Sequence, residues 1–303
     1  MFSLADEFPE RRYRPMDLHV TALALGAAAG LGLSLVLTQL GLRRLTPLRG
    51  ACVSVPVTTV SFLALAPVML DTNSVNGFAA LLFALSGCLF PAAVTLLTFE
   101  ANRQVGPAIT GALGNLSPLF AILIAFLVLG EVPRSGQLVG VAVILAGVLL
   151  IIGAPRSIPH QAFGWTIGLL LVAALIRGLV QPVVKLGLAA WPNPFAATLI
   201  GYLISATVIL SVGASREGHA IVPSRGSGWQ WFVPVGLLNG LSVLAMYAAL
   251  VRGPVAIVAP LVACYPLATL AFSRVLLGSG GITWNTGVGV AITVAGVALL
   301  LRA

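Results

Sequence analysis

Apolar runs long enough to cross a membrane follow one another along almost the whole chain, separated by short polar connectors. A membrane-spanning helix needs about 20 mainly apolar residues, because each residue rises about 1.5 Å through a hydrocarbon core about 30 Å thick. The runs that meet this requirement predict ten spans, at 18–40, 50–70, 77–99, 106–129, 136–153, 164–184, 195–214, 229–250, 254–276 and 283–301. We therefore expect an all-α polytopic membrane protein.

Helices fit these runs better than the strands of a membrane barrel. Barrel strands are segments of about 10 residues with alternating hydrophobicity, whereas the runs here are continuously apolar. Backbone amides in lipid must all be bonded internally, which leaves a helical bundle. The first run follows a polar tail, residues 1–17. It is too long for the core of a signal peptide, about 7 to 15 residues, so we expect an uncleaved first span.

Composition supports a membrane location and excludes several other classes. Of 303 residues, 59% are apolar and 8% charged, against about 25% charged in soluble domains. The 16 basic residues outnumber the 8 acidic ones, but they are spread between the apolar runs. This indicates contact with lipid head groups and no nucleic-acid partner. Cys52, Cys88 and Cys264 lie far apart without ligands at metal-binding spacing, so we expect no disulfide, metal or cofactor.

Catalytic patterns are missing from the sequence. The three histidines, His19, His160 and His219, fall at a span start or in connectors, where they form neither a metal-binding pair nor a hydrolase triad within a span. No aspartate falls within a predicted span, which argues against magnesium-dependent transfer to lipid phosphates. We expect no enzyme activity.

The second half of the chain repeats the first. Shifting it by 146 to 149 residues superposes helix-breaking residues in unchanged order. The pairs are Pro47 with Pro194, Pro107 with Pro254, Pro118 with Pro266, and Gly130 with Gly278. We infer two five-helix repeats, 18–155 and 160–303. Because five is odd, the second repeat enters the membrane inverted, an arrangement typical of transporters whose binding site lies between the halves.

Small residues four apart predict close helix crossings within this bundle. The pairs are Gly26 with Gly30, Gly136 with Gly140, Gly164 with Gly168, and Gly236 with Gly240.

Several of these segments resemble a known family. Gly106-Pro107 to Ser117-Pro118, Phe126 to Glu131, and Gly140 to Val148 look like the fourth and fifth helices of the EamA-type drug/metabolite transporter superfamily. Their counterparts in the second half are Pro266 to Gly278 and Gly289 to Val297. The resemblance implies ten spans in two inverted repeats, an inner-membrane location and cytoplasmic termini. It also implies movement of small metabolites, amino acids among them, often outward. The positive charges are almost evenly divided between the two sides, so the orientation rests on the resemblance alone.

Arg177 is the leading candidate for substrate binding. It lies about 13 residues into the sixth span, where a charge costs at least about 2.5–3.5 kcal/mol unless it meets water, a counter-charge or an anionic ligand. Gln181 follows one turn later on the same helix face. A guanidinium can bind a carboxylate through two parallel hydrogen bonds, which would suit an amino acid.

Other polar residues within spans are candidates for the same cavity, although hydrogen bonding between helices is their commonest use. They are Asn115, Tyr247, Tyr265, Gln39 and Asn239. We expect the cavity to be walled by spans 1, 3, 4, 6, 8 and 9.

Four residues are candidates for gating or coupling. Pro118 and Pro266 are predicted to kink spans 4 and 9. Glu100 could pair with Arg103 at a helix end, or could act as a proton-coupling carboxylate or as the partner of Arg177. Glu131 matches the family's Gly-Glu motif, for which we expect a structural or gating contact at the membrane face.

The function that we predict is secondary transport by alternating access, with export of amino acids or similar small metabolites. The alternative is a flippase or exporter of lipid-linked or phosphorylated sugars, and a helical scaffold or sensor partner stays open. The expected partners are a small-molecule substrate and the lipid bilayer, with the protein as a monomer or a weak homodimer.

Overall fold

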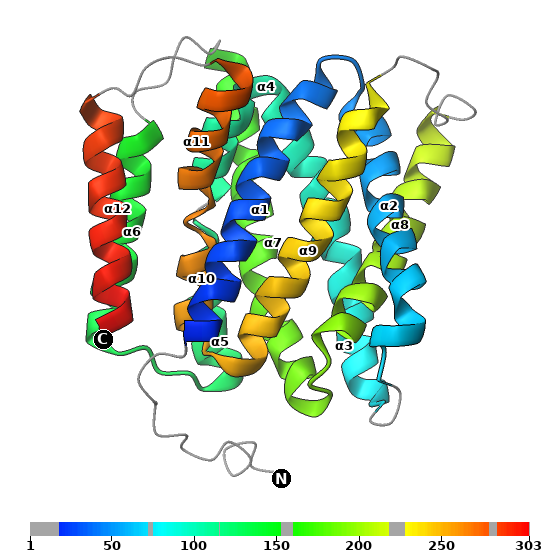
Figure 1. Cartoon of the computed structure of the whole chain (residues 1–303), viewed down its shortest axis with the longest axis horizontal. Coiled ribbons are helices and arrows are strands. Elements are labelled where there is room, and N and C mark those ends of the chain that lie inside the picture. Colours follow the sequence, from blue (N-terminus) through cyan, green and yellow to red (C-terminus); the bar gives the residue numbers. More distant parts are fainter. Residues whose placement is uncertain are drawn as a thin grey trace.

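The computed structural model describes residues 18–71, 75–114, 116–152, 160–217, 228–278 and 284–302. Every regular element in these residues is a helix. The helices are α1 (Leu18–Leu42), α2 (Pro47–Met69), α3 (Gly77–Gly87), η1 (Cys88–Ala93), α4 (Val94–Gly114), α5 (Ser117–Leu129), α6 (Ser135–Ile152), α7 (His160–Ala190), α8 (Pro194–Glu217), η3 (Trp229–Trp231), α9 (Phe232–Arg252), α10 (Val255–Val262), α11 (Tyr265–Leu277) and α12 (Trp284–Arg302). The long helices run alternately up and down in one bundle, and α10 and α11 follow one another in the same direction (Figure 1). Helix α4 is broken at Gly106, which has a φ of 78°. The predicted polar tail, 1–17, lies outside the described residues.

Seven helical stretches of the described chain are long and apolar enough to cross a membrane. They are Leu18–Leu42, Pro47–Met69, Gly77–Pro107, Gly164–Ala190, Pro194–Arg216, Trp229–Arg252 and Val255–Leu277. Three shorter apolar helices, Ser117–Leu129, Ser135–Gly147 and Val288–Leu300, overlap the predicted fourth, fifth and tenth spans. The all-helical membrane fold is therefore confirmed, and the count of ten spans stays a prediction.

The expected kinks at Pro118 and Pro266 are helix starts instead. Both prolines lie in the first turn of a helix, α5 and α11 respectively. There the missing N–H has no partner to lose, and the fixed φ of proline suits the first turn. The predicted fourth and ninth spans thus each consist of two shorter helical pieces that meet within the bundle.

Gly130 and Gly278, which align when the two halves of the chain are compared, have the same structural role. Gly130 and Gly278 follow α5 and α11 in the left-handed conformation, with φ of 67° and 61°. Glycine adopts it without a Cβ clash. The helices that these glycines end run in opposite directions, α5 downward and α11 upward in Figure 1. These two counterpart helices therefore have opposite orientations, as the prediction of an inverted repeat requires.

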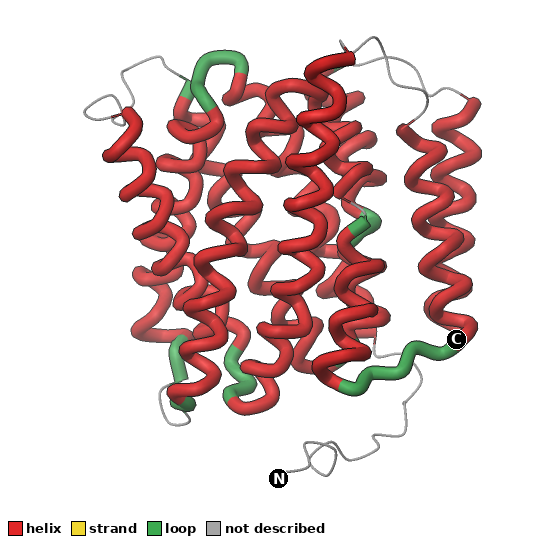
Figure 2. The backbone as a smooth tube through the Cα atoms, turned by 180° about the vertical axis from the view of Figure 1, so that it is seen from behind, coloured by secondary structure: helices red, strands yellow, loops and turns green. Residues whose placement is uncertain are grey.

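Helices of the two halves pack against each other more than they pack within a half. Helix α1 lies against α9 and α11, α2 against α8 and α9, and both α4 and α5 against α7. Helices α6 and α12 form a pair at one edge of the bundle (Figures 1 and 2). The buried core therefore lies at the junction between the halves.

Only some of the predicted small-residue pairs bring helices together. A Cβ at Gly236 would overlap the Ser54 backbone carbonyl of α2, and one at Gly140 would lie 2.7 Å from the Leu300 backbone nitrogen of α12. At Gly26, Gly164 and Gly168 a Cβ would meet nothing within 4 Å, so the prediction of close crossings is wrong there. The spacing alone does not say which helix face meets a neighbour.

This difference gives a direct test of helix packing. We expect Gly236→Ala to destabilise the protein by about 1–3 kcal/mol, because the added methyl must push α2 and α9 apart. The matched change Gly168→Ala should leave stability unchanged or slightly raise it, since alanine favours a helix. Thermal unfolding of the purified protein in detergent measures both. Equal midpoints for the two variants would contradict the close contact of α2 with α9.

Candidate functional site

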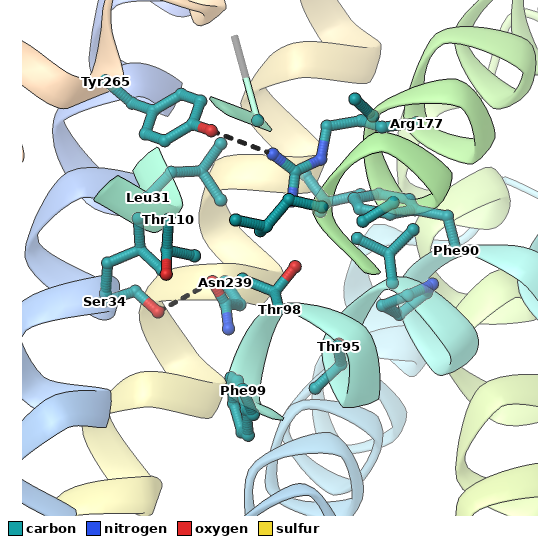
Figure 3. A pocket seen from close by; sticks show the side chains of 18 of the residues that line it. Leu31, Ser34, Phe90, Thr95, Thr98, Phe99, Thr110, Arg177, Asn239 and Tyr265 are labelled. Carbon is teal, nitrogen blue, oxygen red and sulfur yellow. Dashed lines mark hydrogen bonds between the residues drawn. The ribbon is translucent and has the colours of Figure 1, made fainter. Parts of the chain in front are cut away.

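A narrow cavity of about 50 Å³, room for a few water molecules, lies between the two halves (Figure 3). Its walls come from α1, η1 and α4 of the first half and from α7, α8, α9 and α11 of the second. The polar residues that line it are Ser34, Thr95, Thr98, Thr110, Arg177, Tyr202, Asn239 and Tyr265. All six spans that were predicted to wall the cavity, spans 1, 3, 4, 6, 8 and 9, contribute lining residues. Tyr202 of α8 adds a seventh span, which was not predicted.

Arg177 reaches this cavity from the middle of α7. Its Nη1 donates a hydrogen bond to the Tyr265 hydroxyl at 3.3 Å, and its guanidinium carbon lies 5.8 Å from the centre of the Tyr265 ring. Figure 3 shows the two side chains meeting across the cavity from α7 and α11. The Arg177 guanidinium is therefore positioned by an aromatic side chain at the start of α11.

One edge of the guanidinium is left for another partner. The Arg177 Nε is buried and has no hydrogen-bond partner. The Nε–H and one Nη2–H form parallel donors that match the two oxygens of a carboxylate or phosphate. No aspartate or glutamate is among the described residues that line the cavity. Arg177 thus presents its positive charge to a cavity whose described lining residues include no carboxylate.

Glu100, a candidate partner of Arg177, is engaged elsewhere. Its Oε1 accepts hydrogen bonds from Arg103 at 2.7 Å and from Gln104 at 2.6 Å. The predicted pair of Glu100 with Arg103 is therefore present. The proton-coupling role of Glu100 stays a prediction.

A second, smaller cavity adjoins the first. The two share Leu31, Phe90, Arg177, Val243 and Tyr265 as lining residues. The second cavity is also lined by Ser117, Gln181, Ser242, Met246, Ala259, Val262 and Ala263. The pair of Arg177 and Tyr265 therefore borders both spaces.

The remaining predicted site residues are divided among several places. Asn239 lines the main cavity and accepts a hydrogen bond from the Ser34 hydroxyl at 2.8 Å. Tyr247 is 3% exposed within the hydrophobic core, and Gln39 has a buried Oε1 without a partner. Tyr247 and Gln39 do not line the main or the second cavity; other residues of their helices do. Asn115 lies outside the described residues.

An ion pair between the halves lies at one end of the bundle. Glu131, directly after α5, accepts from the Lys185 ammonium of α7 at 2.5 Å and from the Val255 backbone N–H at the start of α10 at 2.9 Å. Lys185 also donates to the Gly253 carbonyl at 2.7 Å. Glu131 is thus a contact point between the first half and two elements of the second. Its part in gating stays a prediction.

The comparison with protein families decides the class. The sequence matches the EamA-like transporter family twice, over residues 20–153 and 164–302. The chain belongs to the EamA-like transporter family. It is accordingly a multi-pass membrane protein of a transporter family, with the two-repeat architecture that the sequence predicted.

Solved structures share the fold of this EamA-like chain. One of them, titled "Crystal structure of protein", superposes with a TM-score of 0.70 at 18% identity, and the match covers 92% of this chain and 95% of that one. At this identity the likeness concerns the fold alone. No curated protein matches the sequence.

Several cavity residues of this EamA-like transporter were not predicted from the sequence. Ser34, Thr95, Thr98 and Thr110 all line the main cavity, and the Thr110 hydroxyl is buried without a partner. Serine and threonine in membrane helices commonly bond the carbonyl four residues earlier, so their presence carries little information by itself. The spacing of Thr95 and Thr98 was a usable signal, because positions i and i+3 share one helix face.

Proposed function

We propose that the chain exports small carboxylate-bearing metabolites, with amino acids as the first candidates. The observation that carries this proposal is the Arg177 guanidinium, whose Nε is buried and unpaired at a cavity without a carboxylate among its described lining residues. Burying a charge within a membrane protein is costly unless a partner compensates it. A bound carboxylate supplies that partner.

The neighbours of Arg177 favour a small substrate with both polar and apolar parts. Threonine hydroxyls at 95, 98 and 110 offer hydrogen bonds, while Leu31, Phe90 and Val243 offer apolar contacts. Sites of this kind orient a ligand with a few polar groups and bind the rest by apolar contact. An amino acid with an aliphatic or aromatic side chain meets both requirements.

Alternating access between the two halves is the mechanism that we propose. The cavity has walls from both halves, so a rocking motion of one half against the other would change its exposure. The contact of Glu131 with Lys185 and Val255 would close the end at which α5 ends and α10 begins. The helix breaks before Pro118 and Pro266 supply places where a half-helix can tilt. The outward direction and the cytoplasmic termini rest on the family resemblance.

The test is a substrate panel measured with the purified chain in proteoliposomes. Labelled amino acids, other carboxylates, amines and sugar phosphates are loaded, and efflux is followed against protein-free vesicles. We expect flux of carboxylates, amino acids above all, and none of simple amines. Flux of sugar phosphates alone would favour the alternative substrate class, because Arg177 could also bind a phosphate. No flux of any compound from folded protein would contradict a transport function for these substrates.

A further inference from the structure

We propose that Gln181 recognises a hydrogen-bond donor beside the substrate's carboxylate, so that the chain prefers α-amino and α-hydroxy acids to carboxylates without such a donor. The inference rests on the proposed function, because it takes Arg177 as the partner of the carboxylate.

The Gln181 side chain is an unsatisfied acceptor facing the second cavity. The residue is 2% exposed and lines that cavity, and its Oε1 is buried without a hydrogen-bond partner. The buried atom without a partner is the amide oxygen, which is a hydrogen-bond acceptor. Buried polar atoms in folded proteins nearly always have partners, so an exception at a cavity wall points to a ligand that supplies the missing donor.

Gln181 and Arg177 are placed to bind neighbouring groups of one molecule. They lie four residues apart on α7, so both point from the same helix face about 6 Å apart along the axis. Their side chains are long and flexible, which lets both polar ends approach one small ligand. Arg177 borders both cavities, while Gln181 borders the second one. A carboxylate on the free Arg177 edge would therefore have its α-substituent close to Gln181.

The chemistry of the two groups ranks possible substrates. An α-ammonium or α-hydroxyl donates to the Gln181 oxygen while the carboxylate binds Arg177. An α-keto acid places a carbonyl oxygen at the same carbon, so two acceptors face each other and both stay unsatisfied. An amine without a carboxylate leaves the Arg177 charge without its partner.

The experiment is competition in proteoliposome counterflow, using the amino acid that moves fastest in the substrate panel. Its unlabelled α-hydroxy and α-keto analogues, which share its carbon skeleton, compete against the labelled amino acid. For leucine these are 2-hydroxy-4-methylpentanoate and 2-oxo-4-methylpentanoate. In the wild type we expect the keto acid to compete about tenfold more weakly than the hydroxy acid. In Gln181→Met, which keeps the length and removes the acceptor, the two should compete about equally.

A matched change in the same cavity provides the control. Ser242→Ala removes a hydroxyl that lines the second cavity and leaves the Gln181 amide in place, so the tenfold preference should persist. Equal competition by the keto and hydroxy acids in the wild type would overturn the inference while carboxylate transport stands. The wild-type series decides the question even if Gln181→Met does not fold. If no carboxylate competes at all, the proposed function itself fails.

Discussion

Replacing Arg177 with glutamine should reduce carboxylate flux by about 100-fold or more, the largest functional effect that we expect of any single change. Removing one partner of a desolvated charge pair costs about 2–5 kcal/mol in comparable binding sites. Arg177→Lys keeps the charge but loses the parallel donors and the planar contact with Tyr265. It should therefore reduce flux less, by about tenfold. Flux from proteoliposomes with equal amounts of folded protein measures both.

An exposed arginine serves as the control for Arg177. Arg216 lies in the last turn of α8 on the surface, so Arg216→Gln removes one positive charge without touching the cavity. Its flux should match the wild type. If Arg177→Gln transports carboxylates as fast as Arg216→Gln does, the guanidinium is not the carboxylate's partner.

Replacing Lys185 with methionine should lower the free energy of unfolding by about 2–3 kcal/mol, the largest effect on stability. The change leaves the Glu131 carboxylate without its cation, and its side chain is 16% exposed. Breaking a fully buried pair costs about 3–5 kcal/mol, and partial exposure to water reduces this. The lost hydrogen bond to the Gly253 carbonyl adds to the effect. Thermal and denaturant unfolding in detergent measure the change.

The more exposed ion pair of Arg103 with Glu100 is the matched control. Arg103 and Glu100 have side chains 48% and 28% exposed, so Arg103→Met should cost less than about 1 kcal/mol. A double-mutant cycle with Glu131→Gln and Lys185→Met should show a coupling of the two residues. Equal losses for Arg103→Met and Lys185→Met would mean that the contact between the halves adds little to stability.

The fold class and the internal repeat were predictable because each depends on the pattern of apolar and helix-breaking residues along the chain. Apolar runs of membrane length specify helices, since lipid leaves the backbone no other partner. Helix ends at Gly130 and Gly278 follow from the conformational freedom of glycine. The roles of Pro118 and Pro266 were assigned incorrectly, because a proline within an apolar run is compatible with a kink and with a new helix start alike. The positions of the flanking breaks depend on how neighbouring helices pack.

The candidate site was predictable at Arg177, a charged residue within an apolar span. Arg177 stood out because a charge in the middle of a membrane helix needs a specific environment, and the structure puts it at a cavity between the halves. Tyr247 and Gln39 had the same polar character but do not line either cavity. The threonines at 95, 98 and 110 were missed because hydroxyls are ordinary in such helices.

Local sequence patterns were therefore enough to predict the membrane environment, the helical fold, the duplication and the mid-span charge of Arg177, which requires a partner. Each of these follows from the composition and spacing of neighbouring residues along the chain. The packing of the folded chain was needed to learn which helices of the two halves meet, that Tyr265 contacts Arg177, and that Glu131 bonds Lys185 and Val255. Arg177 and Tyr265 are 88 positions apart in the chain, and Glu131 and Val255 are 124 positions apart. Rules that depend on neighbouring residues carry no information over such separations.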